Sequence, residues 1–189
     1  MNFTDILELM IKHNASDSFI VPGGPLRARI YSEVQTIDNY PFTLKDVEKF
    51  VTEITDAVER EILKDSKNCE IGINHNDRWR FRVGIFYQRD VPSIVLRKID
   101  LNLMNFEELN LPGAALRKLC QERRGLVLLT GLTGSGKSTA IAAMIEHINQ
   151  NFGRHIMTIE EPIEFTFTDK KSVINQREIN RDVRSYQKA

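Results

Sequence analysis

An uninterrupted apolar run followed at once by a glycine-rich turn constrains the fold of this chain more than any other sequence feature does. Residues 126–130 read LVLLT and residues 131–138 read GLTGSGKS, which matches the P-loop (Walker A) pattern G-x-x-x-x-G-K-[ST]. A continuous apolar stretch is typical of a parallel strand that is covered on both faces. Residues 137 to about 151 follow as a helix, and residues 155–159 read as a second strand. The sequence therefore predicts an α/β unit in strand–loop–helix–strand order.

The residues of the turn suit phosphate binding. Its glycines let the backbone turn tightly, so that successive N–H groups can point at phosphate oxygens. A helix that begins at Lys137 adds its positive dipole end. The Lys137 ammonium would reach the β- and γ-phosphates, where it is a candidate catalytic group, and the Ser138 hydroxyl would complete a Mg²⁺ shell. The predicted nucleotide site comprises Gly131, Thr133, Gly134, Ser135, Gly136, Lys137, Ser138 and the adjoining Thr139.

An acidic cluster lies at the end of the second expected strand. Residues 158–165 read TIEEPIEF. In an open α/β sheet, ligands bind beyond the carboxyl ends of the strands. Carboxylates at that edge can orient Mg²⁺ or polarise an attacking water. On spacing alone, a solvated acidic turn before Pro162 fits equally well.

The first hundred residues have a different pattern. Residues 79–88 alternate apolar and polar side chains, and residues 93–99 read as another strand. Residues 47–54 carry apolar side chains at helical spacing, behind a pair, Thr43 and Asp46, that resembles a capping box. These elements predict a small α+β domain with helices packed on an antiparallel sheet.

Two arginines, Arg82 and Arg97, fall in the middle of the two expected strands. A mid-strand arginine is often a surface residue whose stem lies along apolar neighbours. Its alternative use is as an arginine finger, a cation brought to developing phosphate charge.

Composition narrows the class of protein. The 189 residues carry 26 Lys and Arg against 26 Asp and Glu, so the chain lacks the basic field that binds nucleic acid or anionic membrane. No apolar run approaches the length of a membrane span, and the N-terminus lacks a signal-peptide pattern. The expectation is an intracellular protein with an N-terminal domain at 1–100, a linker at 101–111 and a second, unfinished domain at 112–189.

Over nearly its whole length, the sequence resembles the type IV pilus retraction ATPases, the PilT/PilU group of hexameric secretion-type motors. The matching motifs, in chain order, are ASD at 15–17 with GP at 24–25 and RI at 29–30, RFRV at 80–83 with QR at 88–89, ELNLP at 108–112, the P-loop at 131–138, TIEEPIEF at 158–165 and NQRE at 175–178.

The resemblance implies a PAS-like N-terminal domain and a RecA-like ATPase domain, with ATP and Mg²⁺ bound between them. It also implies a homohexameric ring, an inner-membrane pilus platform protein as partner, and a cytoplasmic location at the inner face of the membrane. Arg82 and Arg97 match arginines that face the nucleotide, and Glu160 matches a glutamate that acts on the hydrolytic water. Glu161 replaces the usual aspartate of the acidic box and is a candidate Mg²⁺ ligand. The implied function is ATP-driven pilus retraction, which produces twitching motility.

The chain departs from the family at Ala189, before any Walker B strand. The strand at 126–130 would then lack its central neighbours and expose apolar surface. We therefore expect the 189-residue chain to be a poor ATPase, although its parent is a competent one. Two alternatives stay open: a pilus-extension or type II secretion ATPase, and a non-catalytic ring subunit that lacks the second half of the ATPase domain.

Overall fold

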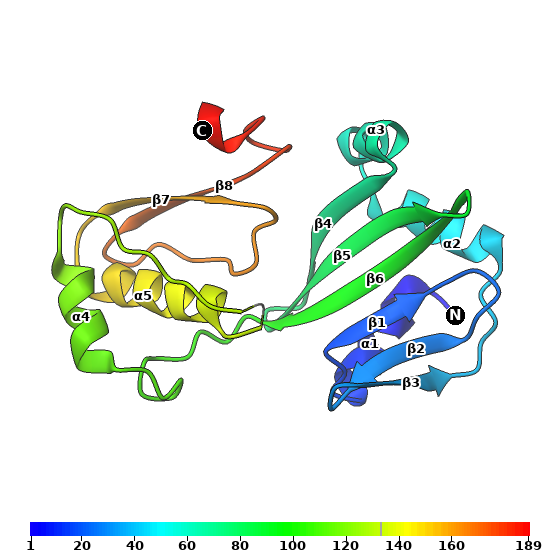
Figure 1. Cartoon of the computed structure of the whole chain (residues 1–189), viewed down its shortest axis with the longest axis horizontal. Coiled ribbons are helices and arrows are strands. Elements are labelled where there is room, and N and C mark those ends of the chain that lie inside the picture. The colour runs from blue at the N-terminus through cyan, green and yellow to red at the C-terminus, as the bar shows by residue number, and fades with distance from the viewer. Residues whose placement is uncertain (133) are drawn as a thin grey trace. The chain divides into compact units, whose positions relative to one another are not determined.

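The computed structural model describes residues 1–132 and 134–189, and it divides into two compact units, Met1–Asp100 and Leu101–Ala189 (Figure 1). Each unit has its own hydrophobic cluster and its own sheet. The two units are therefore described separately.

The first unit is a six-stranded antiparallel sheet with strand order β3-β2-β1-β6-β5-β4. Its strands are β1 (Asp17–Ile20), β2 (Leu26–Ile30), β3 (Glu33–Asp38), β4 (Asn68–His75), β5 (Trp79–Gln88) and β6 (Val91–Asp100). Its helices are α1 (Phe3–Lys12), α2 (Leu44–Ile54) and α3 (Ala57–Ser66). The expected antiparallel sheet with helices is confirmed, and β5 has the predicted bounds.

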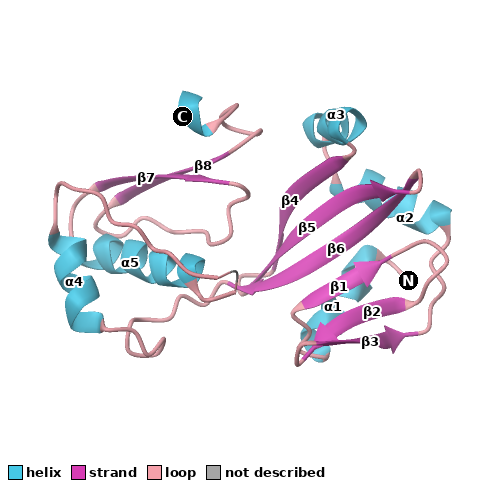
Figure 2. Ribbon diagram, viewed as in Figure 1, coloured by secondary structure: helices cyan, strands magenta, loops and turns pink. Residues whose placement is uncertain are grey.

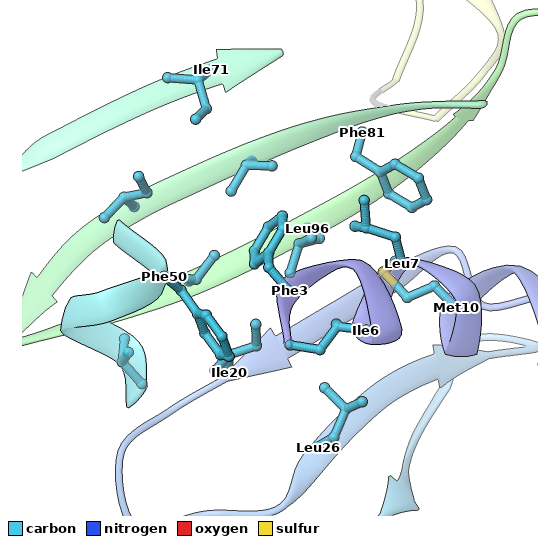
Figure 3. Close-up of a cluster of buried hydrophobic side chains, with 14 of the residues drawn as sticks. Phe3, Ile6, Leu7, Met10, Ile20, Leu26, Phe50, Ile71, Phe81 and Leu96 are labelled. Atoms are coloured by element: carbon cyan, nitrogen blue, oxygen red, sulfur yellow. The ribbon is translucent and has the colours of Figure 1, made fainter. Parts of the chain in front are cut away.

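One face of this sheet forms the core of the unit (Figure 3). Helix α1 contributes Phe3 and Met10, whose side chains pack against Phe81 of β5 and Leu96 of β6. The alternation of β5 places Phe81, Val83 and Ile85 on the buried face. Arg82 and Gly84 consequently lie on the opposite face. The predicted capping box at the start of α2 is present, since Thr43 and Asp46 each bond the other's backbone N–H.

The second unit contains two helices that pack together and a short parallel sheet. The elements are α4 (Gly113–Gln121), α5 (Lys137–Asn151), β7 (His155–Glu160), β8 (Val173–Glu178) and a 3-10 turn, η1 (Tyr186–Lys188). The Arg154 guanidinium donates to the backbone oxygens of Cys120, Gln121 and Glu122. A cation at this position satisfies carbonyls that the end of α4 leaves unpaired.

The predicted strand at 126–130 is wrong: no strand forms there, and the connection from α4 to residue 132 is loop (Figure 2). Among the described residues the sheet of this unit contains only β7 and β8, so the apolar run has no ladder to join. Leu126 is 82% exposed and Leu128 is 74% exposed. The exposure expected for this segment is thus confirmed. None of the helices in the described ranges is both long enough and apolar enough to cross a membrane.

A candidate nucleotide-phosphate site

The glycine-rich turn leads directly into the N-terminus of α5. Gly134 and Gly136 have φ values of 79° and 86°, in the left-handed region that residues with a Cβ rarely adopt. A Cβ on Gly131 would come within 2.8 Å of the Ser135 hydroxyl oxygen. Gly136 is the N-cap of α5, and no side chain of the described residues caps the helix there. The backbone N–H groups of the first turn can therefore donate to an anion.

Lys137 is held over the turn by the backbone. Its Nζ donates to the carbonyl oxygens of Gly131, at 3.0 Å, and Leu132, at 2.8 Å. The ammonium therefore lies at the predicted phosphate-binding loop. Thr139 follows in the first turn of α5, whereas Thr133 lies outside the described residues and its role stays a prediction.

A cavity of about 520 Å³ lies between the start of α5, where Ser138 ends the phosphate loop, and the acidic segment, residues 158–165. Ser138 and Ile141 of α5 line one side of the cavity, and Thr158 and Glu160 of β7 line another. Glu161, which is exposed, also contributes to the lining. The fold thus gathers two motifs of the sequence that are separated by some twenty residues.

Most of the cavity lining is apolar, but it includes a few side chains of the kind that Mg²⁺ prefers. Hydroxyl and carboxylate oxygens are the ligands that this hard cation prefers, and it normally keeps phosphate and water oxygens as well. Ser138 and Glu161 are the residues that would hold it, and the ion would neutralise charge on bound phosphates. Within the described ranges, no group of three or more His, Cys, Asp or Glu side chains forms a metal cage.

The Glu160 carboxylate is held in place by two neighbours. Its Oε1 accepts a hydrogen bond from the Thr158 hydroxyl at 2.7 Å and another from Nε2 of Gln176 at 3.2 Å. Thr158 and Gln176 are directly opposite each other in the parallel pairing of β7 with β8. Neither residue was among the predicted site residues.

A buried cluster on α5 anchors the chain that returns from the acidic segment to β8. The Asn149 side chain donates to the Thr168 carbonyl and accepts from the Lys170 backbone N–H, each at 2.9 Å. The Glu146 carboxylate bonds Lys170 and the side chains of Gln150 and Asn149. Burial alone would raise the pKa of Glu146, but these hydrogen bonds outweigh it and lower that pKa. Sequence reasoning missed this cluster.

In the first unit, Arg82 and Arg97 are Cα partners across β5 and β6. Arg82 is paired with Glu70, to which its Nε donates at 2.8 Å. Arg97 donates to Asp17 at 2.9 Å, and Arg29 donates to the other oxygen of Asp17 at 3.1 Å. Asp17 is only 6% exposed. The two predicted arginines are thus neighbours, each held by a carboxylate, and their contact with nucleotide stays a prediction.

Comparison with known proteins finds similar chains among pilus ATPases. Two relatives from Pseudomonas aeruginosa match all of the chain: the type IV pilus ATPase PilU at 36% identity, over 49% of its own length, and the type IV pilus retraction ATPase PilT at 35%, over 55%. A crystal structure of the pilus retraction motor PilT with bound ADP covers 98% of this chain and 54% of its own, at 35% identity with a TM-score of 0.87. The chain therefore spans about half the length of these relatives.

These matches place the chain among the proteins of bacterial secretion and pilus systems. The family model described as "Type II/IV secretion system protein" matches residues 2–186, nearly the whole sequence. The chain belongs to this family, and it resembles the PilT and PilU pilus ATPases within it.

Proposed function

We propose that this chain is part of an ATP-binding motor subunit that couples ATP hydrolysis to type IV pilus retraction. The observation that carries the proposal is the shared cavity, which brings Ser138 of the phosphate loop together with Glu160 of the acidic segment. In this assignment the loop amides and Lys137 bind the phosphates, Ser138 and Glu161 hold Mg²⁺, and Glu160 polarises the attacking water.

The rest of the assignment extends the same reasoning. The first unit is proposed to be the PAS-like domain and the second the first part of a RecA-like domain. The residues expected as a linker, 101–111, fall within the second unit, where Phe106 packs with Cys120 and Ala143. Arg82 and Arg97 would meet the nucleotide of a homohexameric ring that works on a membrane platform protein from the cytoplasmic side. The similarity of the whole chain to PilT and PilU favours retraction over pilus extension or type II secretion.

Nucleotide binding tests the core of this proposal. We expect the 189-residue chain to bind ATP in Mg²⁺, and Lys137→Ala to weaken that binding by roughly tenfold or more, since charge-assisted contacts to phosphate are lost. Isothermal titration calorimetry measures both affinities. Lys118, an exposed lysine on α4, supplies the matched control Lys118→Ala, which should bind as the parent does. Equal affinity of the parent and Lys137→Ala would remove the site assignment.

A further determination separates the motor from a non-catalytic ring subunit. The DNA that follows the codon of Ala189 is sequenced. A Walker B strand encoded there would support the motor hypothesis. A stop codon directly after Ala189 supports the non-catalytic subunit.

A further inference from the structure

The segment Asn175–Glu178 on β8 contacts the acidic segment at several points, although the proposed function gives it no task. Gln176 and Glu178 point to the same side of the strand, since they are two residues apart. Glu178 is buried, and its Oε2 accepts from the backbone N–H of Ile163 at 3.0 Å. Gln176 reaches Glu160 itself. These two side chains connect β8 to the segment that carries the proposed catalytic carboxylate.

The two ends of the Gln176 amide are each held by a backbone group, one from Phe165 at the end of the acidic segment and one from Phe167 just after it. Its Oε1 accepts from the Phe167 backbone N–H at 3.0 Å, which only an oxygen can do. Its Nε2 donates to the Phe165 carbonyl at 2.7 Å, which only an N–H can do. The orientation of the amide is therefore determined, and the remaining hydrogen of Nε2 faces Glu160.

Both donors to Glu160 reach the same carboxylate oxygen. Thr158 lies two residues before Glu160 on β7, and Gln176 is the cross-strand partner of Thr158, so the three side chains share one face of the sheet. Their hydrogen bonds end on Oε1, and within the described part of the chain none ends on Oε2. Holding one oxygen fixes the direction of the other, which is how supporting hydrogen bonds orient a reacting group.

We infer that Gln176, together with Thr158, is a positioning residue that holds Oε1 of Glu160 and so aims Oε2 at the attacking water. This inference rests on the proposed function, because it gives Gln176 a task only where Glu160 is the group that acts on water. Gln176 is proposed to act without touching the nucleotide or the attacking water. Its effect on the reaction passes entirely through Glu160.

The test compares binding with hydrolysis in the full 189-residue chain. Gln176→Met keeps the length of the side chain and removes its hydrogen bonds, and Gln35→Met, at an exposed position on β3, is the matched control. Affinity for ATP in Mg²⁺ is measured by calorimetry. Hydrolysis is followed in single turnover, with protein in excess over labelled ATP, so that slow reactions are recorded. Gln176→Met should retain nucleotide affinity and lower the single-turnover rate by roughly tenfold or more.

A double-mutant cycle separates positioning from general damage. In a Glu160→Gln background, Gln176→Met should change the rate by less than about twofold, since the carboxylate that it orients is already absent. A full loss in both backgrounds would overturn the inference, as would an unchanged rate in Gln176→Met. If Lys137→Ala binds ATP as the parent does, the proposed function fails first, and that result is seen in binding alone.

A spectroscopic arm covers the case in which parent and Lys137→Ala hydrolyse ATP equally slowly. The side-chain amide resonances of Gln176 are assigned by NMR in the parent. They should move in Glu160→Gln, which replaces the accepting carboxylate, and stay in place in Glu53→Gln, a change at an exposed position of α2. Resonances that do not respond to Glu160→Gln would overturn the inference whatever the rate.

Discussion

Arg82 and Arg97 lie directly opposite each other on the antiparallel strands β5 and β6. Two guanidinium groups on facing positions repel, and the sheet offsets this with a carboxylate for each, Glu70 for Arg82 and Asp17 for Arg97. Asp17 also accepts from Arg29, so one nearly buried carboxylate holds two arginines. These arginines and carboxylates, here called the charge row, therefore form one connected set across the sheet and are not independent surface residues.

Asp17→Asn should destabilise the first unit. The change removes the negative charge that Arg29 on β2 and Arg97 on β6 contact from either side of Asp17, and the free energy of unfolding should fall by about 1–3 kcal/mol. Urea denaturation followed by circular dichroism measures the change. Asp65→Asn, at an exposed position on α3, should stay close to the parent. A loss equal to that of this control would show that the charge row contributes nothing to stability.

Gly134→Ala should weaken nucleotide binding. Gly134 has a φ of 79°, and a residue with a Cβ pays on the order of 1–2 kcal/mol in that region, so the loop would shift away from the conformation that points its N–H groups at phosphate. Calorimetric titration with ATP in Mg²⁺ gives the affinity. Gly84→Ala on β5 is the control, because its Cβ would meet only the Val95 carbonyl at an ordinary 3.9 Å. Affinity preserved in Gly134→Ala would contradict the assigned role of the loop.

The stability contributed by Glu146 should depend on pH. Hydrogen bonds from Lys170, Gln150 and Asn149 overcome the effect of burial and lower the pKa of Glu146 from its usual 4.5. A carboxyl whose pKa is depressed by folding stabilises the protein fully above its unfolded pKa and loses that contribution as the pH falls through the folded value. The difference in unfolding free energy between the parent and Glu146→Gln should thus be large at pH 7 and shrink below about pH 4.5. Urea titrations at several pH values measure it, and a difference that does not vary with pH would be the contrary result.

The 189-residue chain should hydrolyse ATP slowly. The exposed segment at 126–130 leads into the phosphate loop and is not held in a sheet, so the loop lacks the rigid strand on which a catalytic site is normally built. Turnover of this chain is compared with that of its Lys137→Ala variant. Fast, Lys137-dependent hydrolysis by the 189 residues alone would refute this prediction.

Local signals in the sequence predicted much of the fold. The alternation of residues 79–88 and the helical pattern from Lys137 gave the bounds of β5 and α5, because each element carries its own periodicity. Strand β4 was missed although Cys69, Ile71 and Ile73 alternate along it, a signal that could have found it. Edge strand β3 offers less, since most of its residues are exposed. The strand expected at 126–130 does not form, because an apolar run becomes a strand only where another strand pairs with it. In the described part of the second unit, the only strands, β7 and β8, pair with each other.

The candidate site divides in the same way. The phosphate loop is contiguous and was found from its spacing, with Thr133 left outside the described residues. The roles of Gln176 and Glu146 could not be predicted from sequence spacing. They depend on contacts with residues on other elements, Glu160 for Gln176 and Lys170 for Glu146. Arg82 and Arg97 were found one by one, but their pairing depends on strand register.

The exposed leucines ahead of the phosphate loop also affect the tendency of this chain to aggregate at high concentration. Residues 126–130 contain no charge and no proline, and segments of that kind stack readily into intermolecular sheets. Aggregation in concentrated solutions should therefore begin at residues 126–130, and Leu128→Lys should reduce it.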